Sequence, residues 1–168
     1  MYNIDLENRL ISSDITELMQ DYVSIQLDID NTKIKAAAMV AQEIDISRVI
    51  TKANLDRVIG MDPYDTELPE GDLALYELLI APWCYYTYAR CLKMFQGTFT
   101  DSGYSVEAEA ESRNAAKSVA SEMKAIGDTF MLSVTEFLET ENPNTDADDK
   151  LLNSRIRTFG GSENRASN

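Results

Sequence analysis

Histidine is absent from this chain of 168 residues. The imidazole side chain is the most common general base near neutral pH and a frequent ligand of metal ions. No carboxylate pair stands out for acid–base chemistry among the 29 acidic residues, and no nucleophile motif, phosphate-binding loop or dinucleotide fingerprint is present. The sequence therefore predicts a protein that is not an enzyme, with no catalytic residue, no metal site and no cofactor.

Glycine and proline are also scarce, with 7 and 4 residues. Low counts of both favour helices over a turn-rich β-sandwich. Only the stretch near residues 96–105 has the turn residues and the pattern typical of strands. We therefore expect a mainly α fold of about four main helices, with a long C-terminal helix and one small β-hairpin.

Basic residues are few relative to acidic ones, 15 against 29, which gives a formal net charge of -14. Such a chain repels phosphate and should not bind nucleic acid or anionic lipid non-specifically. It is suited to lie beside DNA that must slide past without being held.

Only two cysteines are present, Cys84 and Cys91, and they lie seven residues apart. On one helix this spacing corresponds to about 10 Å of rise, which is too far for a disulfide. We expect both thiols to be packed in the interior of a protein that works in a reducing compartment. The first ten residues contain neither a basic region nor an apolar run, so no signal peptide is expected there.

The most apolar stretch is 73–95, and it contains the only Trp of the chain. Its apolar residues cover nearly every face of a helix, which is typical of a helix surrounded by protein. Glu77 and Pro82 interrupt the run well short of a membrane span, so we expect no membrane partner. Pro82 should kink or split this helix. The core residues that the sequence predicts are Leu79, Pro82, Trp83 and Tyr86 in this helix, and Phe130 in the long C-terminal one.

Four further helices are indicated by apolar residues at intervals of three and four. They span about 14–29, 31–45, 51–59 and 106–139. The expected helix caps are Ser12 to Asp14, Asn31 with Thr32, and Asp72 for the central helix, whereas Gly60 should end the short helix. The long helix has the clearest stripe in the chain, formed by Ala116, Val119, Met123, Ile126, Phe130, Val134 and Phe137.

The end of the chain reverses the sign of the charge. Residues 141–149 hold four acids and no base, whereas residues 150–168 hold four bases and one acid. We predict a helical domain over residues 1–140, followed by an extended C-terminal tail for docking over residues 141–168. The expected docking residues are Leu151, Leu152, Arg155, Ile156, Arg157 and Phe159. The alternative for this tail, a disordered chain end, stays open.

Four segments in this order resemble the head–tail connector proteins of tailed phages, which are also called adaptor or head-completion proteins. They are AQEIDI at 41–46, leading through 49–51 to Ile59-Gly60, then LLIAPWCYYTYARCL at 78–92, TFTDSG at 98–103, and VTEFLET at 134–140. The likeness is strongest to the connectors of crAss-like phages that infect Bacteroides. Thr51 departs from the pattern, because many relatives carry Gly in that turn.

The resemblance implies a structural virion protein with a helical adaptor fold. It would assemble with itself into a ring, often of twelve copies, below the portal protein at the portal–tail neck. The ring would extend the DNA channel, through which DNA passes without specific binding, and join the capsid to further neck and tail proteins. The protein would be made in the host cytoplasm, and its C-terminal segment would reach onto the portal. The residues alone also allow a non-enzymatic helical regulator that binds another protein.

Overall fold

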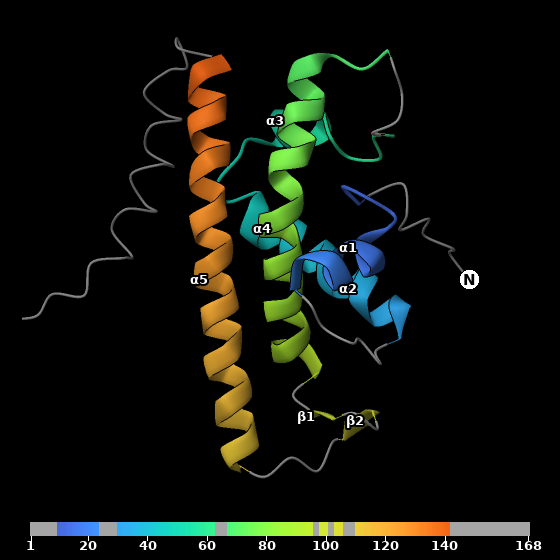
Figure 1. Ribbon diagram of the computed structural model, residues 1–168, viewed down its shortest axis with the longest axis vertical. Helices are drawn as coiled ribbons and strands as arrows, with labels where there is room; N and C mark the ends of the chain where they lie inside the picture. Colours follow the sequence, from blue (N-terminus) through green and yellow to red (C-terminus); the bar gives the residue numbers. More distant parts are fainter. Residues whose placement is uncertain are drawn as a thin grey trace, which may run out of the picture.

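The computed structural model describes residues 10–23, 30–62, 67–95, 98–100, 103–105 and 110–141. In this part the chain is mainly helical, which confirms the expected fold class (Figure 1). The elements are α1 (Ile15–Val23), α2 (Asn31–Ala41), the π-helical segment η2 (Gln42–Ile46), α3 (Lys52–Asp56), α4 (Glu70–Phe95), β1 (Thr98–Thr100), β2 (Gly103–Ser105) and α5 (Ala110–Glu141). The two strands pair antiparallel, with Phe99 opposite Tyr104.

Helix α4 is the element on which the others pack. Helix α5 lies beside it over most of its length, whereas α1 and α2 contact it from another side (Figure 1). The buried core joins side chains of α1, α2, α3, α4 and α5 with those of the segment before α1. The expectation that the apolar stretch 73–95 forms a helix surrounded by protein is therefore confirmed.

Pro82 does not divide this helix, which runs from Glu70 to Phe95 as one element. Of the two predicted effects, a kink or a split, the split is wrong, and the kink stays a prediction. A proline inside a helix removes one hydrogen bond and costs roughly 3 kcal/mol. Here Pro82 is buried next to Trp83, whose side chain is fully enclosed between helices. Burial of this part of α4 offsets the local cost.

The helix caps differ from the predicted ones at two places. Helix α2 is capped by Asp30, whose carboxylate accepts a hydrogen bond of 2.8 Å from the Thr32 N–H, one residue earlier than expected. Helix α4 begins two residues before Asp72, whose carboxylate binds Arg57 instead. The partner of Asp72 lies 15 positions away, so local sequence patterns do not reveal it.

The helix expected over about 14–29 is confirmed over Ile15–Val23, and its remaining residues, 24–29, lie outside the described part. The short helix expected over 51–59 is shorter than predicted, because α3 ends at Asp56. Thr51 caps it by accepting a hydrogen bond of 3.3 Å from the Asn54 N–H, in an extended conformation that a β-branched residue adopts readily.

The residues just before α1 belong to the core. Leu10 and Ile11 are fully buried. The Gln42 side chain accepts a hydrogen bond of 3.0 Å from the Ile11 N–H. Gly60, with a φ of 67°, donates its N–H to the Leu10 carbonyl at 3.0 Å. A positive φ is easy for glycine and strained for other residues, so Gly60 allows this contact.

Gly127 allows α5 to approach α4 closely. A Cβ atom at this position would lie 2.7 Å from Cε1 of Tyr86. That ring is 1% exposed, and its hydroxyl donates a hydrogen bond of 2.7 Å to Asp128, so the ring has little room to move. Overpacking of this kind costs about 1–3 kcal/mol.

We therefore expect Gly127→Ala to lower the free energy of unfolding by about 1–2 kcal/mol, although alanine itself favours helix by up to about 1 kcal/mol. Denaturant titration measures the change. Gly127→Ala in a Tyr86→Leu background is the matched control, and there the loss should shrink. A variant more stable than the wild type would show that α4 and α5 are not held at this separation by the glycine.

Candidate functional site

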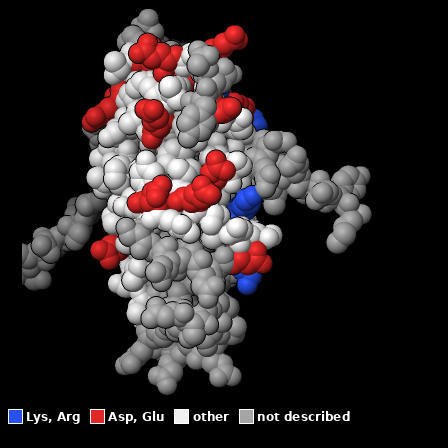
Figure 2. Space-filling model, turned by 45° about the vertical axis from the view of Figure 1, so that its right-hand side comes forward, with Lys and Arg blue, Asp and Glu red and all other residues white. Residues whose placement is uncertain are grey.

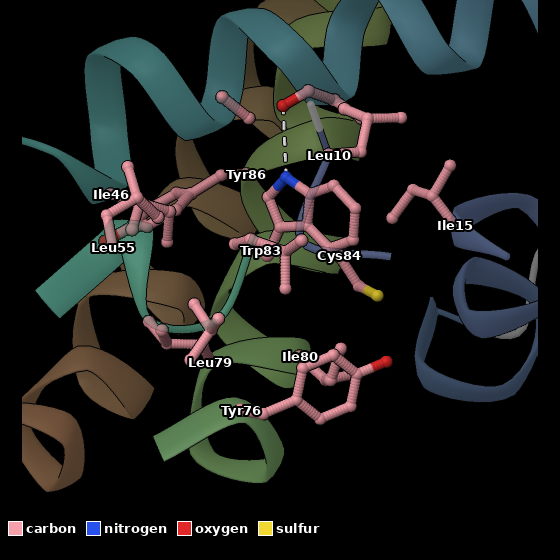
Figure 3. Close-up of a cluster of buried hydrophobic side chains, with 14 of the residues drawn as sticks. Leu10, Ile15, Ile46, Leu55, Tyr76, Leu79, Ile80, Trp83, Cys84 and Tyr86 are labelled. Carbon is pink, nitrogen blue, oxygen red and sulfur yellow. Dashed lines mark hydrogen bonds between the residues drawn. The ribbon is translucent and has the colours of Figure 1, made fainter. Parts of the chain in front are cut away.

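Four of the five predicted core residues are buried. Leu79 and Trp83 are fully buried, Tyr86 is 1% exposed, and Pro82 is also buried. The indole N–H of Trp83 donates a hydrogen bond of 3.0 Å to the Ala38 carbonyl of α2 (Figure 3). These residues hold the fold together, and their side chains are not exposed on its surface.

Phe130 is the exception, because its side chain is 42% exposed. Its predicted place in the core is wrong. The side of α5 that faces inward runs through Ala120, Gly127, Met131 and Val134, all buried. Phe130 precedes Met131 by one residue, or about 100° around the helix. The apolar stripe of α5 is therefore wider than the face that α4 covers, and Phe130 lies on the uncovered part.

The exposed ring of Phe130 is part of an aromatic patch with Tyr85 and Tyr22. The Phe130 and Tyr85 rings stack at 5.5 Å between centroids, with 15° between their planes. The Tyr85 hydroxyl donates a hydrogen bond of 3.2 Å to the Tyr22 carbonyl, and the Tyr22 side chain is 41% exposed. Residues of α1, α4 and α5 thus meet at this patch, in which the rings of Tyr85 and Phe130 are stacked and Tyr22 contributes its backbone carbonyl.

Two carboxylates border the patch. Burial raises the pKa of Tyr22, and so do electrostatic interactions with Cys84, Asp21 and Glu77. Asp21 and Glu77 are both exposed, and neither forms an ion pair with any residue in the described part of the chain. The Tyr22 side of the aromatic patch therefore lies near two exposed carboxylates that could receive a cation.

A second exposed apolar side chain lies on another side of α5. Leu132 is 49% exposed and follows Phe130 by two residues, or about 200° around the helix. Val119, 36% exposed, lies about 20° from Phe130 when the helix is viewed along its axis. Helix α5 therefore presents apolar side chains in two different directions.

Arg57 fixes the end of α5 against the start of α4. Its guanidinium donates hydrogen bonds of 3.0 and 3.3 Å to the Glu141 carboxylate and one of 2.6 Å to Asp72. Hydrogen bonding to Glu141 raises the pKa of Arg57. A Cβ atom at Gly71 would displace the Glu141 carboxylate from this cluster. Arg57 therefore anchors Glu141, the last described residue of α5, to the start of α4.

A buried ion pair connects η2 with α4. Arg90 donates hydrogen bonds of 2.7 and 2.9 Å to the two carboxylate oxygens of Asp45, whose side chain is only 3% exposed. Hydrogen bonding to Asp45 raises the pKa of Arg90. Sequence patterns gave no sign of this pair, because the two residues are 45 positions apart. Both lie in segments that carry the resemblance to phage connectors.

The two thiols are buried and poorly suited to react. Burial raises the pKa of Cys84 and of Cys91 to about 12, and neither cysteine is in a disulfide. A thiolate is needed for nucleophilic attack.

We expect both thiols to be alkylated at pH 8 only after denaturant unfolds the chain, as mass spectrometry would show. Fast labelling of the native protein would contradict the burial of α4.

The same raised pKa values predict a dependence of stability on alkaline pH. A thiol with a higher pKa in the folded state than in the unfolded state stabilises the fold fully below the unfolded value, near 9. That contribution is lost as pH rises from about 9 to about 12.

In the described residues no three acidic or cysteine side chains are grouped to hold a metal ion. No helix in that part is long and apolar enough to cross a membrane.

The predicted docking residues of the tail, from Leu151 to Phe159, lie outside the described residues, which end at Glu141. The boundary between a domain over 1–140 and a tail over 141–168 stays a prediction.

Comparison with known proteins places this mainly helical domain in a family. Residues 46–152 match the model of a family of unknown function, DUF6712. The matched region runs from the last residue of η2 to a point just beyond α5, and the chain belongs to this family. No curated protein and no solved structure matches the chain.

Proposed function

We propose that this chain is a structural, non-enzymatic virion protein, a head–tail connector that forms a ring below the portal. The ring would extend the DNA channel and join the capsid to neck and tail proteins. The observation that carries the proposal is that α5 presents exposed apolar side chains in two directions, Phe130 on one side and Leu132 on the other. A ring needs two different contact surfaces on every subunit, because each copy meets its neighbours head to tail.

The order of elements also supports the proposal. A helix that ends in AQEIDI, a short helix, a central helix with YAR near its end, and a long final helix are the features on which the resemblance to connectors rests. In the structure they correspond to α2 with η2, α3, α4 and α5. The Asp45–Arg90 ion pair joins the first of these segments to the third.

The charge of the protein fits a channel wall. The net charge is -14, and Asp and Glu side chains are spread over the face shown in Figure 2, where Lys and Arg are fewer. Like charge repels DNA phosphates and lowers non-specific binding. DNA could then pass through the ring without adhering to it.

Locating this chain in purified virions by electron microscopy tests the proposal. Density for α4 and α5, repeated around the axis between portal and tail, is the expected result. A chain absent from virions, with a mass in solution of one or two copies, would favour the alternative, a helical regulator that binds another protein.

The tail provides a second test, because we propose that it attaches the ring to the portal or to a neighbouring subunit. Deleting residues 150–168 should leave the subunit folded by circular dichroism and abolish its attachment to portals. Arg155→Glu with Arg157→Glu should weaken attachment in a salt-dependent way. Phe159→Ala should weaken it at high salt too, because apolar burial is not screened. Normal yields of joined particles from the truncated chain would contradict this role for the tail.

A further inference from the structure

The chain carries a segment whose chemistry matches the aromatic patch. The patch offers the stacked rings of Tyr85 and Phe130, and Tyr22 lies beside them through its backbone carbonyl. The exposed carboxylates of Asp21 and Glu77 lie close enough to Tyr22 to act on its hydroxyl. Residues 150–159 read KLLNSRIRTF and hold three bases, four large apolar residues and no acid. Arginine side chains stack on aromatic rings and pair with carboxylates, so both features of the patch suit this segment.

The segment can reach the patch. The described part of α5 runs to Glu141, whose carboxylate accepts a hydrogen bond from Arg57. Phe130 lies eleven residues back along the helix, or roughly 16 Å away along the axis. The ten residues from Glu141 to Leu151 could span up to about 33 Å when extended. A tether of this length gives an effective concentration in the millimolar range, well above that of a second copy in dilute solution.

We propose that the aromatic patch is a docking site for residues 150–159 of the same chain, which occupy it before assembly. This inference rests on the proposed docking role of the tail and adds its regulation. The segment covers an exposed apolar surface of the subunit. While it is bound there, it is not free to bind the portal or a neighbouring subunit. The portal or a neighbouring subunit must then compete with the patch to capture the tail.

Limited trypsin digestion of the full-length chain tests the proposal, because trypsin cleaves after Arg155 and Arg157. A synthetic peptide of residues 147–163 gives the intrinsic cleavage rate. In the full chain we expect cleavage at these sites to be about tenfold slower, since proteolysis follows the population of the undocked segment. The protection should not change when the protein is diluted, because the contact is within one chain.

Phe130→Ala should raise the cleavage rate to that of the peptide. Phe130 is 42% exposed, so this variant should fold, which its melting curve checks. Leu132→Ala is the matched control, since Leu132 is also exposed on α5 but points in another direction, and it should leave the protection unchanged. Asp21→Asn with Glu77→Gln should speed cleavage at low salt and have little effect at high salt.

Three results would overturn the proposal. They are cleavage of the wild-type tail as fast as the peptide, equal effects of Phe130→Ala and Leu132→Ala, and protection that grows with protein concentration. The last result would assign the contact to a second copy. The digestion needs neither portal nor virion, so its failure would not contradict the connector proposal. Conversely, if the chain were absent from virions but its tail were protected, the connector proposal would fail and the contact between tail and patch would remain.

Discussion

Replacing Trp83 with Ala is expected to lower the free energy of unfolding by about 3–5 kcal/mol. Trp83 is fully buried where α4 meets α2, among side chains from several elements of the core (Figure 3). The truncation removes a large apolar surface and leaves a cavity that helices fixed on two sides of α4 cannot fill. It also removes the hydrogen bond from the indole N–H to the Ala38 carbonyl.

The Ala38 carbonyl still has a partner in the variant, because it also accepts the Gln42 N–H at the end of α2. The cost of Trp83→Ala should therefore come mainly from the lost packing. Trp83→Phe is the matched variant, since it keeps an aromatic ring while losing the N–H group. We expect it to cost clearly less than Trp83→Ala in urea titrations followed by circular dichroism. Equal losses would mean that the hydrogen bond dominates, contrary to this account.

Replacing Arg90 with Met is expected to cost about 3–5 kcal/mol, as is typical when one partner of a buried ion pair is removed. The Asp45 carboxylate is 3% exposed and would lose both hydrogen bonds that Arg90 donates. The remaining cation, Arg48, lies 3.7 Å from Asp45 and is itself 57% exposed. An exposed partner stabilises a carboxylate by only about 0–1 kcal/mol, so Arg48 cannot compensate.

The pair should be asymmetric. Arg90 is 24% exposed, so after Asp45→Ala its guanidinium can turn toward water, and the loss should be smaller than for Arg90→Met. Arg48→Met is the matched control and should change stability by no more than about 1 kcal/mol. Denaturant titrations of the three variants measure these differences. A larger effect of Arg48→Met than of Arg90→Met would show that Arg48, and not Arg90, is the main partner of Asp45.

The candidate surface was only partly predictable from the sequence. The long helix and its apolar stripe followed from the spacing of Val119, Met123, Phe130 and Val134. The spacing does not say which side of a wide stripe turns toward the neighbouring helix. In the structure the side with Gly127 and Met131 turns inward, because only glycine lets the Tyr86 ring approach so closely. Phe130 was therefore assigned to the core, although it is exposed beside Tyr85.

The sequence by itself determined the helical fold class and the enclosed central helix. These follow from local periodicity, the scarcity of glycine and proline, and the apolar character of residues 73–95 on nearly every face. Local patterns of this kind act over a few residues, so they are readable before any packing is known.

The tertiary structure alone decided which long-range partners meet. It joined Asp45 to Arg90 and Glu141 to Arg57, which are 45 and 84 positions apart, and it brought the rings of Tyr85 and Phe130 into one patch. It also kept α4 continuous through Pro82. The physical reason is that ion pairing, stacking and burial depend on distance in space. The packing of the helices sets that distance, and the order of residues along the chain does not.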